Sequence, residues 1–111
     1  MATTVGDAAK VAILNSFKAR FNTVGLNNTG SGGAITPVTI GTNWTLTGTV
    51  LSNTNLLTFN CPLNAQPTKA IVYITGTADS EILIDLTGGP FVFTTAGSFT
   101  IEAGGLTLEV A

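Results

Sequence analysis

The sequence predicts a mainly β protein, a β-sandwich or jelly-roll-like fold of antiparallel sheets preceded by one N-terminal α-helix. Three observations support this prediction. Apolar residues recur at helical spacing before residue 22. From residue 35 onward they alternate with threonine and other polar residues, as in strands that bury one face. Glycine, proline and asparagine divide this region into about seven short strands. A partly open barrel is the competing architecture.

The 111 residues suit a single domain, which we expect to have two parts. Residues 1–33 combine the helix, at about 5–21, with a linker rich in glycine and asparagine, and residues 34–111 form the sandwich. Ala9, Ile13, Phe17 and Phe21 recur every four residues and predict the apolar stripe of the helix. Residues 22–33 contain four glycines and three asparagines, which indicates an irregular loop.

Alternation then predicts the strands in order. Residues 44–50 place Trp44, Leu46, Gly48 and Val50 on one face and threonines on the other. Residues 57–61 continue the pattern, and residues 70–75 are apolar on both faces, as in a central strand. Further strands are expected at 82–86, 91–93, 99–103 and 106–110. Gly104-Gly105 indicates a two-residue hairpin between the last two.

Charge is scarce, because only 9% of the residues are charged, against about a quarter in a typical domain. No charged residue occurs between Arg20 and Lys69. Four lysines and arginines are too few for extended phosphate contacts, so we expect no nucleic-acid partner. The longest apolar run, residues 70–74, is far shorter than the roughly 20 residues of a membrane span, so no membrane association is expected either.

The sequence contains no histidine and a single cysteine, Cys61, which we expect in the core. It therefore offers neither a zinc site nor a Cys–His pair. Asp79, Glu81 and Asp85 form the one acidic cluster. A solvated strand face, with Ile82, Ile84 and Leu86 buried behind it, is favoured there over weak calcium binding or a glycosidase pair. We expect no catalytic residue, cofactor or metal.

Several segments, taken in order, resemble small virion proteins of tailed bacteriophages. They are Asp7–Lys10 continuing through Leu14–Phe17, then Leu56–Phe59 with Pro62 and Lys69–Ile71, and finally Phe93–Ile101 with Gly104–Leu108. Relatives often carry a histidine-containing segment that ends in Asp-Pro-Gly soon after the helix. This chain has Val24–Gly30 there, so the contacts of its loop are expected to differ.

The resemblance implies a non-enzymatic structural protein of the virion. The N-terminal segment has no basic stretch followed by an apolar one, so we expect a chain made in the host cytoplasm without processing. The first hypothesis is a capsid decoration or minor head protein that binds the major capsid protein at capsomer junctions, as a homo-oligomer and preferably a trimer. The alternatives are a minor tail, baseplate or fibre component that contacts tail proteins, and a carbohydrate-binding module.

In the first hypothesis the helix and the loop after it form an arm that lies on a neighbouring subunit. The chain then offers its apolar helix stripe and nearby residues as an interface. The candidates are Val5, Ala9, Ile13, Phe17, Phe21, Leu26 and Trp44. Trp44 fits the core of its own chain better than an interface.

Overall fold

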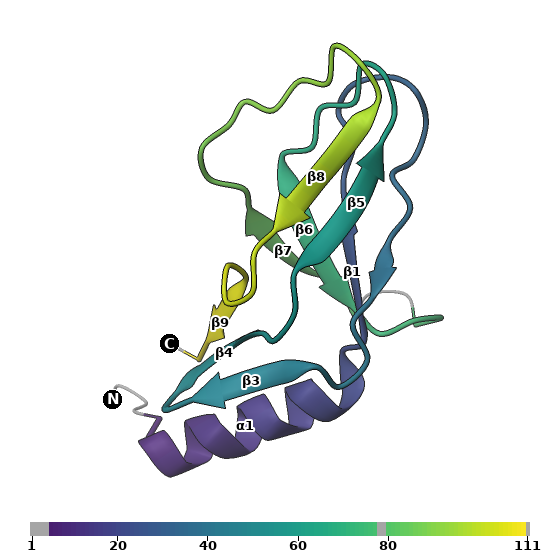
Figure 1. Ribbon diagram of the computed structural model, residues 1–111. Coiled ribbons are helices and arrows are strands. Elements are labelled where there is room, and N and C mark those ends of the chain that lie inside the picture. The colour runs from purple at the N-terminus through teal and green to yellow at the C-terminus, as the bar shows by residue number, and fades with distance from the viewer. Residues whose placement is uncertain (1–4, 78–79, 111) are drawn as a thin grey trace, which may run out of the picture.

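Three antiparallel β-sheets follow one α-helix in the computed structural model, which describes residues 5–77 and 80–110. The helix, α1, spans Asp7–Arg20 and lies across one end of the sheets (Figure 1). The mainly β fold that the sequence predicts is confirmed, and the sheets stack in a sandwich-like arrangement (Figure 1).

The largest sheet has four strands in the order β2-β1-β6-β7. They are β1 (Thr23–Leu26), β2 (Val38–Thr39), β6 (Lys69–Tyr73) and β7 (Ile82–Asp85). The second sheet has the order β3-β4-β9, with strands β3 (Trp44–Thr47), β4 (Val50–Asn53) and β9 (Thr107–Glu109). The third sheet pairs β5 (Leu57–Cys61) with β8 (Gly97–Ile101).

The interior is built by the alternation that the sequence predicts. The three apolar side chains of β5 are buried, and the two polar ones between them are exposed. The predicted central strand is β6, which lies between β1 and β7. Ile82, Ile84 and Leu86 are partly buried against the core, while Leu83 is 56% exposed. The prediction of their shared inner face is confirmed.

A strand occupies part of the segment predicted as a linker. β1 is buried at all four residues and lies between β2 and β6, so the linker prediction is wrong for Thr23–Leu26. Asparagines flank this strand and bind the backbone beside it. Asn22 Oδ1 accepts a hydrogen bond from Thr75 N–H (3.1 Å), and Asn27 Oδ1 accepts one from Lys69 N–H (2.8 Å). The composition that indicates a loop therefore fixes both ends of a strand.

The segment after β1 is irregular, as predicted, but it is fixed to its own chain. Asn28 Oδ1 accepts hydrogen bonds from the backbone N–H groups of Gly30 and Gln66, both at 2.9 Å. A side chain at Gly30 would collide with the backbone carbonyl of Asn64, so only glycine permits this approach. The loop therefore packs on its own chain, and its contact with a neighbouring subunit stays a prediction.

Two turns differ from the sequence predictions. The strand predicted over residues 44–50 is a hairpin, because Gly48 has a φ of 60° and reverses the chain between β3 and β4. Gly104-Gly105 does not join a hairpin, since β8 pairs with β5 whereas β9 pairs with β4. The strand predicted at residues 91–93 is irregular.

The helix α1 packs one face on the β3–β4 hairpin of its own chain (Figure 1), and contact of its other face with a neighbouring subunit stays a prediction. Leu14 is its buried residue, and Phe17 and Phe21 are partly buried against the core, as predicted. Ala9 and Ile13 are exposed, so the predicted stripe is wrong for them. Residues four apart differ by about 40° around a helix. The row of residues at this spacing therefore faces the sheet at Phe21 and Phe17 but faces solvent at Ile13 and Ala9.

Trp44 connects the end of the helix to β3. Its indole Nε1 donates a hydrogen bond to the Phe21 carbonyl oxygen at 2.9 Å. The ring of Phe17 stacks on that of Phe21 at 4.0 Å and meets Trp44 edge-on at 5.7 Å. These three aromatic rings close the helical end of the core.

Asn53, at the end of β4, binds the turn that separates β8 from β9. Its side chain is buried, and its Nδ2 donates to the carbonyl oxygens of Asn55 (2.8 Å) and Glu102 (2.9 Å). Its Oδ1 accepts from Leu106 N–H at 2.9 Å. The Gly104 N–H also donates to the Asn53 carbonyl oxygen at 2.8 Å. Hydrogen bonds to Asn53 therefore hold the turn between β8 and β9. In the predicted hairpin, pairing between these two strands would have held it instead.

The helix orientation predicts a difference between two neighbouring substitutions. Leu14→Ala should lower the free energy of unfolding by about 2–4 kcal/mol, because it leaves a cavity between α1 and the hairpin. Ile13→Ala should change it by less than about 0.5 kcal/mol, because Ile13 is 50% exposed. Urea unfolding of both variants measures this. Equal losses would mean that the helix packs through the predicted stripe.

Asn53→Ala should lower the free energy of unfolding by about 2–4 kcal/mol, because it leaves the buried Leu106 N–H and its neighbours without a partner. Asn55→Ala is the matched control, since the Asn55 side chain is exposed and only its carbonyl oxygen takes part. Thermal unfolding compares the two variants. If Asn55→Ala lowered the free energy of unfolding as much as Asn53→Ala does, the loss would not come from the hydrogen bonds of the buried Asn53 side chain.

Candidate functional site

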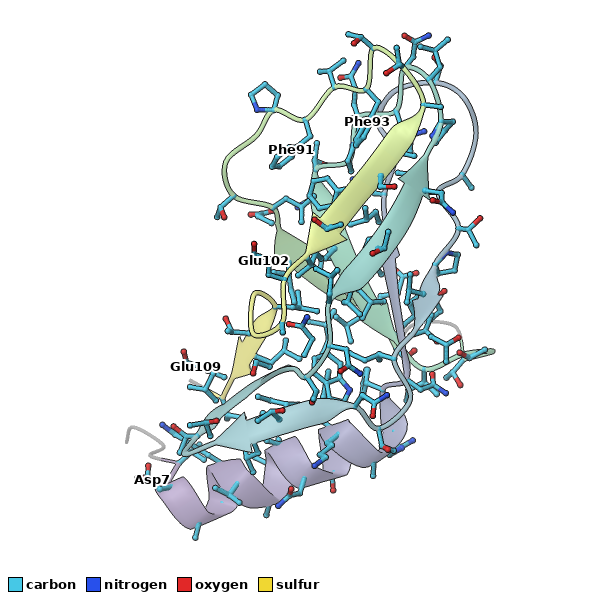
Figure 2. The ribbon with its side chains drawn as sticks, viewed as in Figure 1. Asp7, Phe91, Phe93, Glu102 and Glu109 are labelled. Carbon is cyan, nitrogen blue, oxygen red and sulfur yellow. The ribbon has the colours of Figure 1, made fainter. Side chains whose placement is uncertain are left out.

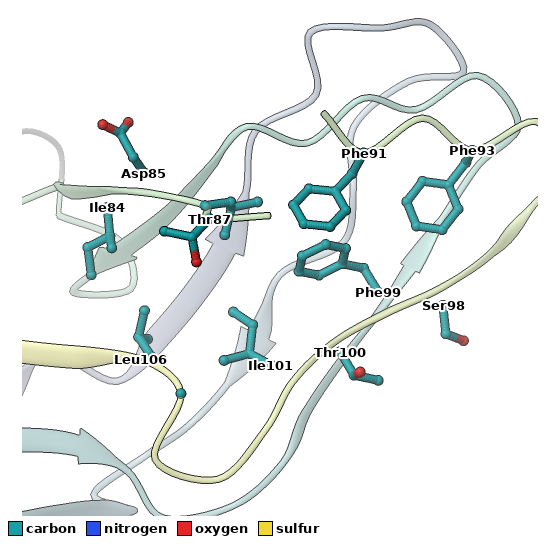
Figure 3. A pocket seen from close by; sticks show the side chains of 12 residues that line it. Ile84, Asp85, Thr87, Phe91, Phe93, Ser98, Phe99, Thr100, Ile101 and Leu106 are labelled. Carbon is teal, nitrogen blue, oxygen red and sulfur yellow. The ribbon is translucent and has the colours of Figure 1, made fainter. Parts of the chain in front are cut away.

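A groove of about 490 Å³ lies between β7 and β8, beneath the segment that connects them (Figure 3). Seven of its twelve lining residues have large apolar side chains. They are Ile84, Leu86, Phe91, Phe93, Phe99, Ile101 and Leu106. Its volume lies in the range of about 300–1,000 Å³ that is typical of ligand sites.

Strand alternation supplies two walls of this groove. Ile84 and Leu86 face inward from β7 and the residue after it, and Phe99 and Ile101 face inward from β8. The ring of Phe91 packs edge-on against Phe99, with 4.9 Å between the ring centroids (Figure 3). The residue types that build the sandwich core therefore also line its partly open side.

The connecting segment is fixed at one point by backbone hydrogen bonds. Phe93 N–H donates to the Ala65 carbonyl oxygen at 3.0 Å, and Asn64 N–H donates to the Phe93 carbonyl oxygen at 2.7 Å. At the other end of the groove, the turn bound by Asn53 supplies Gly105 and Leu106. Both ends of the groove are thus held by residues distant in the sequence.

The polar groups at the groove are hydroxyls and one carboxylate. Thr87, Ser98 and Thr100 line it, together with Asp85. Asp85 is 82% exposed, accepts a hydrogen bond from Lys69 Nζ at 2.9 Å, and points away from the aromatic rings (Figure 3). Within the described residues, no group of three histidine, cysteine or acidic side chains is placed to hold a metal ion. The arrangement is suited to burying apolar side chains.

Acidic residues accompany the groove along one side of the molecule. Glu102 follows β8 and Glu109 ends β9, and Figure 2 shows both on the same side as Phe91 and Asp7. None of the described residues that line the groove is a lysine or arginine. Asp85 is the charged residue among those that line the groove and is paired with Lys69, while Glu102 and Glu109 lie on the same side as Phe91 (Figure 2).

The predicted interface residues do not form this groove. Leu26 and Trp44 are only 5% and 3% exposed, so their inclusion in an interface is corrected, since their own chain covers them. Phe17 and Phe21 are partly covered in the same way.

The remaining three predicted interface residues are at least partly accessible. Ala9 and Ile13 lie on the exposed face of α1, and Val5, just before the helix, is half-buried. The helix therefore brings Ala9 and Ile13 together on one surface, away from the buried Trp44.

The acidic cluster is only partly described. Asp79 lies outside the described residues, Glu81 is exposed just before β7, and Asp85 is paired with Lys69. The clearest sequence signal for the groove is the placement of three of the six phenylalanines at positions 91, 93 and 99. The sequence pattern predicted a strand at residues 91–93, so the position of Phe91 and Phe93 over the groove was not expected.

No protein family, curated protein or solved structure matches this chain. Among the described residues, no helix has both the length and the apolar character needed to cross a membrane. The interpretation of the groove therefore depends on its geometry and on the surface around it.

Cys61 provides a test of the packing between β5 and β8. Burial raises the pKa of the Cys61 thiol, although a hydrogen bond with the Phe99 backbone acts in the opposite direction. The folded state therefore keeps the thiol proton at a pH where the unfolded chain has lost it, so stability should fall as the pH rises above about 8.5. Urea unfolding at several pH values measures this, and Cys61→Ala should reduce the alkaline loss. An equal loss in this variant would assign it to other groups.

Proposed function

We propose that this chain is a non-enzymatic structural protein of a tailed-phage virion. In this proposal it is a capsid decoration or minor head protein that binds the major capsid protein at junctions between capsomers. The observation that carries the proposal is a surface with large exposed apolar side chains and very few charges. The resemblance of the helix and the C-terminal segments to small virion proteins gives this surface its biological context.

Among the residues that the structure describes, five large apolar side chains are at least half exposed, and they are spread over the helix, the loops and β7. They are Ile13, Leu56, Leu63, Leu83 and Val92. The chain as a whole carries ten charged residues out of 111. Neighbouring subunits can cover such a surface without removing ions from water, which is costly when the ions are unpaired. This supports a protein that functions while partly covered.

A protein that binds only the assembled shell stabilises the shell by mass action. A trimer would place three copies of each weak contact on one junction, and the effective concentration of the second and third contacts would strengthen the whole. Because α1 and the loop after it pack on their own chain, these contacts would come from exposed side chains such as Ile13 rather than from an extended arm.

The proposal predicts a high, fixed ratio of this chain to the major capsid protein in purified particles. Quantitative mass spectrometry of the particles measures this ratio. A few copies per particle would contradict the decoration proposal and favour the tail, baseplate or fibre alternative. As a second measurement, particles without this chain should lose their DNA at a lower temperature than complete particles.

A further inference from the structure

We propose that the groove between β7 and β8 binds an extended segment of a partner protein, with apolar residues in alternation and lysine or arginine at its ends. The bound segment would add a strand to the sandwich. This inference concerns the groove alone, so it does not depend on the type of assembly to which the chain belongs.

The first support is the topology. β7 pairs with β6, β8 with β5 and β9 with β4, and no described strand pairs with the other edge of β7, β8 or β9. These three strands lie on the same side of the molecule (Figure 1). Strands of this kind present backbone N–H and C=O groups to which a further strand can bind.

The second support is the way in which the strands line the groove. Successive side chains of a strand point to opposite faces, so a cavity over one face touches every second residue. This groove is instead lined by four consecutive residues of β8, Ser98–Ile101, and by the last two residues of β7, Ile84 and Asp85, with the two that follow the strand. The cavity therefore lies beside the edges of both strands, which is where an added strand would sit.

The third support is the apolar floor. Phe91, Phe99 and Ile84 are only partly buried. Phe99 and Ile84 pack against the core, and the ring of Phe91 packs edge-on against Phe99. Alternate apolar side chains of an added strand would cover these residues, and its other side chains would face solvent near Thr87 and Thr100. Covering partly exposed apolar surface provides the driving force for binding.

Charge identifies the kind of segment that would bind. Glu102 and Glu109 lie on the same side as Phe91 (Figure 2), and Asp85 lines the groove, where it is paired with Lys69. Lysine or arginine at the ends of the segment would complement these carboxylates.

A second copy of this chain does not supply such a segment from its described residues. Three of its cations lie on α1, and the fourth, Lys69, lies on the central strand β6. The occupant is therefore a different protein.

The test uses the intact protein and a capped synthetic heptapeptide, Lys-Val-Thr-Val-Thr-Val-Lys, followed by NMR of the backbone amides. The peptide should shift the amides of residues 84–87 and 98–101, with smaller effects on α1. A peptide with glutamate at both ends should bind several-fold more weakly. A peptide with proline in place of both threonines should lose most of its binding, because proline cannot donate a backbone hydrogen bond.

Two matched pairs of variants test the protein side. Phe91→Ala should weaken binding ~10-fold, whereas Val92→Ala, at the exposed neighbouring residue, should leave it within about twofold. Glu102→Lys should weaken binding of the lysine peptide several-fold at low salt, because Glu102 directly follows the lining residue Ile101. Glu81→Lys should have little effect, because Glu81 precedes the first lining residue of β7, Ile84, by three positions. Both glutamates are exposed, so these variants should fold normally.

Several results would overturn the proposal. One is the absence of shifts in residues 84–87 and 98–101 at millimolar peptide. Equal binding of the glutamate or proline peptide would refute the charge or the strand argument, respectively. If the same amides shift with protein concentration alone, the occupant is a second copy. If only a small apolar dye or a glycan shifts them, the groove is a small-molecule site.

Discussion

The side-chain amide of Asn53 makes the contacts on which the separation of the sheets depends. It bonds to both sides of the turn at residues 102–106, and so β8 remains with β5 while β9 crosses to β4. A Gly-Gly hairpin would instead have placed β8 and β9 side by side in one sheet. The divergence of these strands leaves the side of the sandwich between β7 and β8 open, and the same turn supplies Gly105 and Leu106 to the groove.

Asparagine has a wider role in the region without charged residues. Asn22, Asn27 and Asn28, which lie at the ends of β1 and in the loop after it, accept hydrogen bonds from backbone N–H groups within residues 66–75. Asn53, at the end of β4, accepts one from Leu106. A buried amide loses much less hydration free energy than a buried ion, and each satisfied hydrogen bond contributes about 1 kcal/mol. The scarcity of charge between Arg20 and Lys69 thus has two explanations. Within the chain, neutral amides connect distant segments, and in the proposed assembly neighbouring subunits cover part of the surface.

The sequence predicted those strands whose buried positions can be recognised from the residues of the strand itself. β5 and β7 follow from alternation, and β6 follows from a short run that is apolar on both faces. β1 was missed because its strand character comes from its neighbours β2 and β6 and not from its composition. The helix was predicted, but the predicted apolar stripe contained Ile13, whereas the buried residue is Leu14. Spacing alone does not show which side of a helix a sheet will contact. The groove was not predictable, because β7, β8 and residues 91–93 meet only in the folded chain.

The pairing of early strands with late ones has a consequence for how the chain folds. β4 and β5 find their partners β9 and β8 only after residues 97–109 have joined the chain, about 40 to 60 positions further on. Contacts between such distant residues require large loops to close, and proteins rich in them fold slowly. Until then, the apolar edges of β4 and β5 stay accessible to other nascent chains, so synthesis rate and chaperones would decide how much of this protein reaches its native state.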